Sequence, residues 1–375
     1  MPRSCTVPVS RCTLHFKLEP DGLRRHKGAV PIKPERLCYG DTIGIIAPAS
    51  APPDPKAIDR SVEVLQRMGF KTKLAPNVRK RWGFLAGSDR DRAADLMGMF
   101  RDRKVQAIIC VRGGYGAARL LPLLDYEVIR RNPKIFVGYS DITSLHIAFL
   151  KKANLISFHG PMLNSDFIKE NCPEFTVQSF LRTLMEPEPA GSICGASPKS
   201  KVQSPKPGQV QSSTPINREQ EFKVQSSRFK IQVLRDGVAS GQLVGGNITL
   251  LCTTLGTAYQ MSFRDKILFF EDLDEKPYGF DRMLTHLLNS GVMRGVAGIA
   301  IGINKGCKDP KATKAKEYRQ TLEDVFRERL LRLKVPVVMG LPFGHIRHNA
   351  TLPVGARVTL DAEKGNLVIA EAAVK

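Results

Sequence analysis

The first half of the chain alternates short apolar runs with stretches whose apolar residues recur at helical spacing. Residues 41–48, 105–111 and 135–139 have the length of strands, and the last two are continuously apolar, as in strands covered on both faces. Residues 54–70 and 88–100 have the pattern of helices, and the second opens with a variant of the capping box. This alternation predicts a parallel sheet.

The second half mixes the two kinds of element in another order. Its predicted elements are strands at 266–272, 296–303 and 335–345 and helices at 281–292 and 314–331. The tail, 351–372, alternates around a turn, as antiparallel hairpin strands do. The predicted fold class is therefore α/β, with an N-terminal parallel-sheet domain of flavodoxin-like or Rossmann-like type and a C-terminal α+β domain with mixed or antiparallel strands.

Two segments interrupt these patterns. Residues 1–36 form a basic, irregular extension, and residues 186–236 are rich in Pro, Ser, Gln and Lys. We expect the second segment to be a disordered insert or linker, because it contains too little apolar surface to pack. The remaining residues are predicted to form two domains, 37–185 and 237–375.

Composition and charge narrow the class of protein. The 375 residues are 42% hydrophobic and 25% charged, as in a globular protein. No apolar run approaches the roughly 18 residues that span a membrane, and the N-terminus has no uninterrupted apolar h-region, so we expect a cytoplasmic location and no membrane partner. The net charge of +21 suggests an anionic partner, but residues 1–36 and 199–236 each carry eight Lys and Arg against three acids. Solvated tails are a better interpretation than nucleic-acid binding.

Three residues with catalytic side chains follow predicted strands, namely Ser140, Glu271 and His345. A hydroxyl, a base that takes its proton and an acid that orients the base are the parts of a serine hydrolase. Each residue also has an ordinary interpretation. Ser140 or Asp141 can cap a helix, Glu271 can be a solvated acid at a strand end, and His345 can be a loop histidine.

The glycine-rich "RGGYG" at 112–116 also follows a predicted strand. Glycines let a backbone approach a ligand closely, so this loop can supply one N–H to an oxyanion hole, and the N–H after Ser140 can supply another. The chain lacks the G-x-S-x-G elbow, the G-x-x-x-x-G-K loop and H-E-x-x-H. His345 and His348 have no carboxylate close by in the sequence, and we expect no metal and no cofactor.

Taken together, these motifs make the chain similar to one family. It resembles the LD-carboxypeptidases, or muramoyltetrapeptide carboxypeptidases, which are serine peptidases and include the microcin C self-immunity peptidase. The matching stretches cover about three quarters of the chain in order, and among them are "GDTIGIIAPAS", "AIICVRGGYGAARLLPLLDYEVIRRNPKIFVGYSDITSLH", "SFHGPML", "GQLVGGNITLLCTTLGT", "LFFEDLDEKPYGFDRML" and "GLPFGHIRHNATLPVG". Residues 1–36 and 187–235 have no counterpart in the family.

The resemblance implies roles for particular residues. Ser140 matches the nucleophile and His345 the general base. Glu271 matches the acid that orients the histidine, with Glu275 of the same motif as the alternative. The backbone N–H groups of Gly114 and Asp141 match the oxyanion hole.

The resemblance also implies the reaction. We expect hydrolysis of an amide between an L-centre and a terminal D-amino acid, through an acyl-enzyme and without a cofactor. The implied substrate is the murein tetrapeptide of cell-wall recycling, with lysine or diaminopimelate as its third residue, and the alternative is a peptidyl nucleotide. Arg112 is a candidate for binding the substrate carboxylate or is a structural arginine. Family members commonly form homodimers, and we expect one here.

Overall fold

A computed structural model describes residues 30–170, 172–195, 229–307 and 320–375. The chain divides into two compact units, Met1–Val30 and Pro31–Lys375. Both halves that the sequence pattern predicts therefore lie in the second unit, and the account that follows concerns that unit.

The first sheet has six strands in the order β12-β5-β4-β3-β1-β2. Its strands are β1 (Thr42–Ile46), β2 (Lys71–Leu74), β3 (Ala107–Cys110), β4 (Ile135–Gly138), β5 (Ser157–His159) and β12 (Leu352–Val354). The five that come first in sequence pair in parallel, whereas β12 is antiparallel to β5. The order 2-1-3-4-5 is that of flavodoxin-like sheets, whose sites lie beyond the carboxyl ends of the strands.

The second sheet has eight strands in the order β6-β14-β13-β8-β9-β10-β11-β7. Its strands are β6 (Gly191–Ser192), β7 (Gln232–Arg235), β8 (Val238–Asn247), β9 (Lys266–Glu271), β10 (Gly298–Gly302), β11 (Val337–Leu341), β13 (Arg357–Asp361) and β14 (Asn366–Ile369). The four strands from β8 to β11 are parallel and the outer ones pair antiparallel, so this sheet is mixed.

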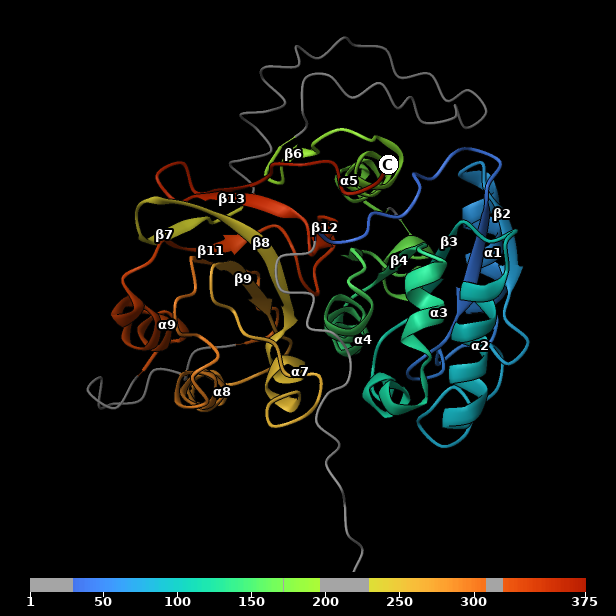
Figure 1. Ribbon diagram of the computed structural model, residues 1–375, viewed down its shortest axis with the longest axis horizontal. Coiled ribbons are helices and arrows are strands. Elements are labelled where there is room, and N and C mark those ends of the chain that lie inside the picture. The colour runs from blue at the N-terminus through green and yellow to red at the C-terminus, as the bar shows by residue number, and fades with distance from the viewer. Residues whose placement is uncertain (1–29, 171, 196–228, 308–319) are drawn as a thin grey trace, which may run out of the picture. The chain divides into compact units, whose positions relative to one another are not determined.

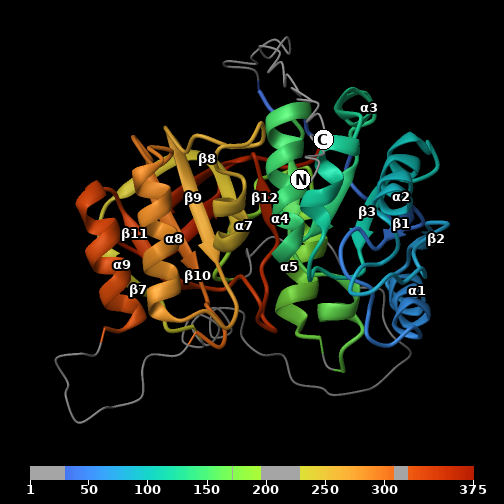
Figure 2. The same ribbon diagram turned by 90° about the horizontal axis from the view of Figure 1, so that it is seen from below.

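Helices cover both sheets (Figure 1). The α-helices are α1 (Ala57–Arg67), α2 (Asp89–Arg101), α3 (Tyr126–Arg131), α4 (Thr143–Ala148), α5 (Glu174–Met185), α7 (Ile248–Thr253), α8 (Pro277–Asn289) and α9 (Leu322–Leu330). The short helical turns are η1 (Ala117–Leu123), η2 (Ser140–Ile142), η3 (Phe149–Ala153), η4 (Leu163–Phe167) and η6 (Leu331–Leu333). Figure 2 shows α1 and α2 on opposite faces of the first sheet, as in doubly wound folds, and α8 beside α9 along the second.

Several contacts join the first half of the chain to the second. Strand β12, from the C-terminal half, extends the first sheet through Leu352 opposite His159. The Thr143 hydroxyl, which follows β4, accepts a hydrogen bond of 2.9 Å from the Asn247 N–H at the end of β8. Gly246 lies against the same threonine, because a Cβ there would be 2.4 Å from its hydroxyl oxygen.

The predicted fold class is confirmed. Both the parallel sheet and the mixed second sheet are present, and the hairpin of β13 and β14 turns where the sequence pattern placed it. The predicted helix at 314–331 begins at Leu322, where Thr321 and Asp324 form a capping box, and residues 314–319 lie outside the described part. The predicted strand at 335–345 ends at Leu341, because Pro342 follows and has no N–H for a ladder.

One predicted irregular segment is partly ordered. Residues 186–236 were expected to be a disordered insert or linker, but β6 and β7 lie inside that range and pair with β14 and β11. Residues 196–228 lie outside the described part. Residues 30–36, the described part of the predicted basic extension, belong to no named helix or strand, and the Ile32 N–H donates to the Asn154 carbonyl at 2.6 Å.

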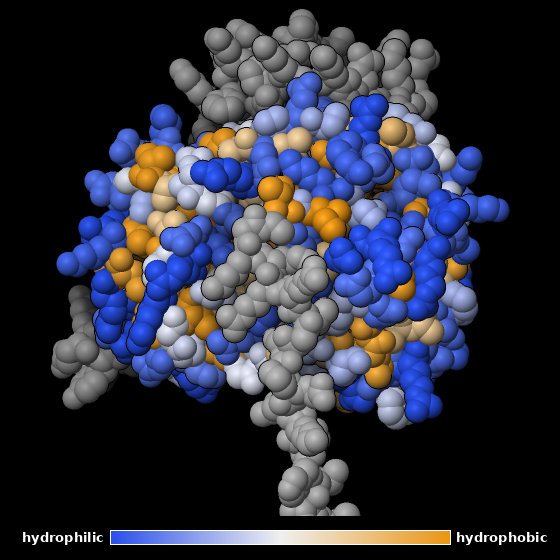
Figure 3. Space-filling model, in the orientation of Figure 1, coloured by the Kyte–Doolittle hydropathy of each residue, from blue (hydrophilic) through white to orange (hydrophobic). Residues whose placement is uncertain are grey.

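The core lies between the sheets and their helices, and the buried strands are almost wholly apolar. On the face that Figure 3 presents, hydrophilic residues predominate and hydrophobic ones are scattered in small groups, as is usual for a protein surface. None of the described helices is both long enough and apolar enough to cross a membrane.

Candidate active site

Ser140 lies at a sharp corner between a buried strand and a helix. Strand β4 ends at Gly138, and Ser140 has a φ of +64°, which is in the left-handed region that non-glycine residues seldom adopt. Its hydroxyl is within hydrogen-bond distance of His345 and accepts from no helix N–H among the described residues. The interpretation of Ser140 as a simple helix cap is therefore wrong.

The three residues singled out in the sequence form one hydrogen-bonded chain. The Ser140 Oγ lies 2.9 Å from Nε2 of His345, and Nδ1 of His345 lies 2.7 Å from a carboxylate oxygen of Glu271. Ser140 comes from the first sheet, Glu271 ends β9 of the second, and His345 lies on the loop after β11. This is the relation of nucleophile, base and orienting acid that a serine hydrolase requires.

The surroundings of His345 favour its protonated form. Burial alone lowers its pKa, but the hydrogen bond to Glu271 and the negative charges of Glu271, Asp272 and Asp166 outweigh burial, so the pKa lies above its ordinary value. Glu271 itself is fully buried, and its second carboxylate oxygen has no hydrogen-bond partner among the described residues. A buried carboxylate against one ring nitrogen fixes the tautomer whose other nitrogen accepts a proton.

The glycine-rich loop after β3 is held by backbone hydrogen bonds at Gly113, Tyr115 and Gly116. The Gly113 carbonyl accepts from the Ser50 N–H at 3.3 Å, and the Ser50 hydroxyl accepts from the Tyr115 N–H at 3.1 Å. Buried Arg92 donates to the Gly116 carbonyl at 2.9 Å. These contacts come from the loops after β1 and from α2, so neighbouring elements of the first sheet fix the shape of the loop.

Asp141 ties this loop to the corner that carries Ser140. Its buried carboxylate accepts a hydrogen bond of 2.7 Å from the N–H of Ala117, the first residue after the loop. Burial raises the pKa of Asp141 to about 6, although the Ala117 hydrogen bond and the positive charge of Arg92 act in the opposite direction. This hydrogen bond therefore joins the loop to the corner.

Several backbone N–H groups of the loop and the corner have no hydrogen-bond acceptor within the described residues, and those of Gly114 and Asp141 are among them. The neighbouring Gly113 packs so closely that a Cβ there would be 3.3 Å from both the Ser140 Oγ and the Asp141 nitrogen. Gly114 has a φ of +110°, and a Cβ on it would meet Ser50 at 2.5 Å. Both positions thus require glycine.

Sequence comparison gives the family. The profile of the LD-carboxypeptidase N-terminal domain matches residues 43–160, and that of the C-terminal domain matches residues 240–360. A probable murein peptide carboxypeptidase of Bacillus subtilis is 36% identical over 337 residues, which are 90% of this chain and 94% of that protein. The chain belongs to the LD-carboxypeptidase family. It is a hydrolase, a carboxypeptidase of the serine type.

Solved structures of this family have the same fold. The muramoyltetrapeptide carboxypeptidase of Oxalobacter formigenes superposes with a TM-score of 0.70 at 30% identity, over 88% of this chain and 99% of that one. The microcin C7 self-immunity protein MccF, in complex with glutamyl sulfamoyl guanosine, superposes with a TM-score of 0.73 at 26% identity, over 92% of this chain and 100% of that one.

The two remaining candidate residues, Glu275 and Arg112, make other contacts. Glu275 is not beside the histidine, because its carboxylate lies over the start of α8, where a Cβ on Gly279 would be 2.3 Å from it. Arg112 donates to the Ala51 carbonyl at 3.4 Å, beside the glycine-rich loop. Among the residues that the structure describes, no group of three or more His, Cys, Asp or Glu side chains is placed to hold a metal ion.

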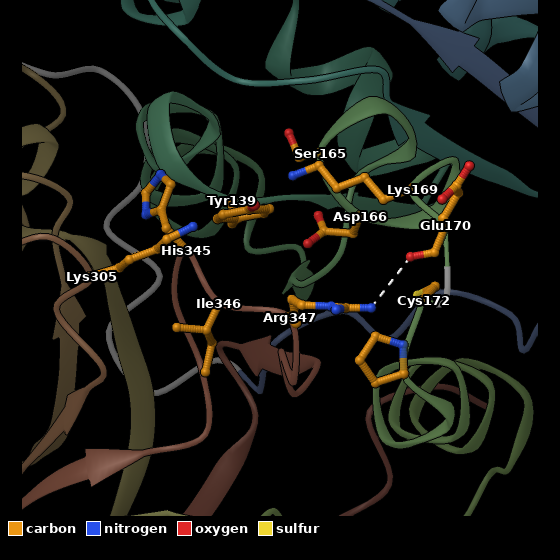
Figure 4. Close-up of a pocket in the computed structure, with 11 residues that line it drawn as sticks. Tyr139, Ser165, Asp166, Lys169, Glu170, Cys172, Lys305, His345, Ile346 and Arg347 are labelled. Carbon is orange, nitrogen blue, oxygen red and sulfur yellow. Dashed lines mark hydrogen bonds between the residues drawn. The ribbon is translucent and has the colours of Figure 1, made fainter.

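A pocket opens beside His345. Figure 4 shows its lining, which includes Tyr139, Asp166 and three basic residues from separate loops, Lys169, Lys305 and Arg347. The sequence pattern gave no indication of this pocket, because its residues come from the loops after β4, β5, β10 and β11, which converge only in the fold. Ser50 and Arg92, which hold the glycine-rich loop, were missed because nothing in the sequence shows that they contact it.

Proposed function

We propose that this chain is a cytoplasmic serine LD-carboxypeptidase that releases the terminal D-alanine of murein tetrapeptides. The observation that carries the proposal is the hydrogen-bonded chain from Ser140 through His345 to Glu271. The names of two relatives support the substrate class, a probable murein peptide carboxypeptidase and a muramoyltetrapeptide carboxypeptidase. A role in the recycling of cell-wall peptides follows from that substrate.

In the proposed reaction, the Ser140 hydroxyl attacks the carbonyl carbon of the L,D amide while Nε2 of His345 takes its proton. Glu271 orients the ring and stabilises the imidazolium that forms. His345 then gives the proton to the nitrogen of the leaving D-alanine, and the C–N bond breaks to leave an acyl-enzyme. Water, deprotonated by the same histidine, attacks the ester and releases the tripeptide.

The carbonyl oxygen becomes negatively charged when Ser140 attacks, and it needs hydrogen-bond donors. The N–H groups of Gly114 and Asp141 are proposed to be those donors, since both lack an acceptor within the described residues and the family resemblance implies this role for them. Donors that are fixed before the reaction need no reorganisation, and removing one from such a site costs roughly 10²- to 10³-fold in kcat. The hydrogen bonds of Ser50, Arg92 and Asp141 supply this rigidity.

The second candidate is a serine amidase that acts on a peptidyl nucleotide. The likeness to MccF in complex with glutamyl sulfamoyl guanosine favours it, with a TM-score of 0.73. The chemistry at Ser140 is the same for both substrates, so the groups that bind the leaving part distinguish them. A homodimer, two domains divided near 185 and 237, and independence from metal remain predictions.

The test is the release of D-alanine from UDP-MurNAc-tetrapeptide, measured for wild type and Ser140→Ala with EDTA present. Release by wild type alone supports a metal-independent serine carboxypeptidase. Equal release by both proteins contradicts the role of Ser140. Hydrolysis of a peptidyl sulfamoyl nucleoside, without release of D-alanine, would favour the second candidate.

A further inference from the structure

The pocket beside His345 adjoins the residue that would protonate the leaving group. In the proposed reaction His345 gives a proton to the nitrogen of the departing D-amino acid, so that nitrogen must be within hydrogen-bond reach of the ring. The pocket wall includes His345 and Tyr139, whose rings are 5.0 Å apart between centroids. Tyr139 immediately precedes Ser140 in the chain. A leaving group in contact with the histidine can therefore extend into this pocket.

The basic residues of the pocket come from three different loops. Lys169 follows η4, Lys305 follows β10 and Arg347 follows β11, so residues distant in sequence bring positive charge to one place. Figure 4 shows the side chains of Lys169 and Lys305 extending toward Tyr139 from opposite sides. The guanidinium of Arg347 is turned to the other end of the pocket, where it donates to the Glu170 carbonyl at 3.3 Å.

Among the described residues, neither Lys169 nor Lys305 forms an ion pair with an acid of the pocket. Asp166 is only 8% exposed, and its carboxylate accepts from the Met162 N–H at 2.9 Å. Burial raises the pKa of Asp166 to about 6, although the Met162 hydrogen bond and the positive charge of Lys169 act in the opposite direction. The Glu170 carboxylate points away from His345 in Figure 4. The two lysines therefore define a site for an anion.

We propose that Lys169 and Lys305 bind the free α-carboxylate of the leaving D-amino acid, and so restrict the enzyme to the C-terminal bond of its substrate. This inference rests on the proposed function, because it assumes that the leaving group is a C-terminal amino acid. A carboxylate one residue beyond the scissile bond is the group that distinguishes a carboxypeptidase substrate from an internal peptide bond. Arg112 does not line this pocket, and its guanidinium donates to the Ala51 carbonyl.

The test compares two substrates that differ only in the group concerned, a murein tetrapeptide ending in D-alanine and the same peptide ending in D-alaninamide. The values of kcat and KM are measured for wild type, Lys305→Met, Lys169→Met and the double variant. Lys305→Arg retains the charge, and Lys104→Met changes an exposed lysine of the loop before β3. Both pocket lysines are exposed, so we expect the variants to fold with an unchanged Tm.

Charged hydrogen bonds predict the size of the effect. Wild type should prefer the free acid by about tenfold or more, and the double variant should lose about 10- to 100-fold in kcat/KM for the acid, mainly through KM. Its kcat/KM for the amide should change less than about threefold, and Lys305→Arg should recover most of the loss. Lys104→Met should match wild type on both substrates.

Two results would overturn the inference while leaving the proposed function intact. Equal losses on acid and amide would mean that the lysines do not act on the carboxylate. An undiminished preference for the acid in the double variant would mean that other residues bind it. If wild type releases D-alanine or D-alaninamide from neither peptide, the proposed function fails first, and the inference fails with it.

Discussion

Replacing Glu271 by glutamine tests the hydrogen-bonded chain at its most buried point. The substitution keeps the shape of the side chain but removes its charge and converts one oxygen into an amide donor. The carboxylate oxygen lies 2.7 Å from Nδ1 of His345. If the new amide donates to Nδ1, the ring carries its proton on Nε2 and cannot accept one from Ser140.

The size of the loss has two parts. A hydrogen bond to a charged group contributes about 1.5–3 kcal/mol. Loss of the carboxylate removes this stabilisation from the imidazolium that forms during the reaction, which lowers kcat by about 10- to 150-fold. The wrong tautomer raises the total to about 10³- to 10⁴-fold. KM should change little, because Glu271 is fully buried and does not reach the pocket. The free energy of unfolding should not fall by more than about 1 kcal/mol, because a buried charge is removed without a change of volume.

The matched control is Glu275→Gln, the same chemical change four residues later in the same motif. The Glu275 carboxylate lies at the start of α8, so its loss should cost less than about 1 kcal/mol of stability and less than about threefold in kcat. Both variants are assayed for D-alanine release from a murein tetrapeptide, with Tm measured on the same preparations.

One pattern of results would refute this reasoning directly. If Glu275→Gln loses a thousandfold in kcat while Glu271→Gln stays near wild type, the orienting acid has been misassigned. If neither variant loses activity at an unchanged Tm, the contact between Glu271 and His345 is structural and the proposed mechanism lacks its third member.

The other predictions concern the corner, the glycine-rich loop and pH. Gly114→Ala should lower kcat and should destabilise the protein more than Gly40→Ala does. Gly40 also has a positive φ, but it has open space where a Cβ would lie. Equal losses of Tm in the two variants would contradict the close packing at Gly114. Ser140→Gly should abolish activity. Its free energy of unfolding should nevertheless exceed that of Ser140→Ala by about 1 kcal/mol, because glycine adopts the φ of +64° without strain. A Tm below that of Ser140→Ala would contradict the strain. Because the pKa of Asp141 is raised to about 6, the folded protein loses stability as pH rises from about 4 to 6. The Tm of Asp141→Asn relative to that of wild type should therefore rise as pH increases from about 4 to 6. A Tm difference that stays constant over this pH range would refute the prediction. The acid limb of kcat/KM should have its midpoint above about 6.5, because the pKa of His345 is raised, and a midpoint below 6 would contradict the assignment.

Much of the fold could be predicted because its strands are continuous apolar runs and its helices are periodic. The parts that were missed depend on tertiary contacts. Strand β7 is ordered by pairing with β11, and no local signal in Gln232–Arg235 shows that partner. The helix after residue 314 was predicted too long, since charged residues continue the pattern before the capping residue Thr321.

The candidate site shows the same division. Ser140, Glu271 and His345 could be found because each follows a strand and lies in a motif of the family, and the sequence pattern alone gave them ordinary alternatives. The choice between Glu271 and Glu275 needed the distance to the histidine. The lysines of the pocket could not be found, because loops from three parts of the chain converge only after folding.

The pairing of β12 with the first sheet has a consequence for how the protein is made in the cell. Strand β5 pairs with β4 on one side, and its other edge stays open until Leu352–Val354 arrives from near the end of the chain. His345 precedes that strand by only a few residues. During synthesis the first sheet is therefore completed, and the base delivered to Ser140, at almost the same moment. A nascent or truncated chain has an exposed strand edge and no hydrolytic activity, and a fragment that ends before β12 should aggregate unless the missing strand is supplied as a peptide.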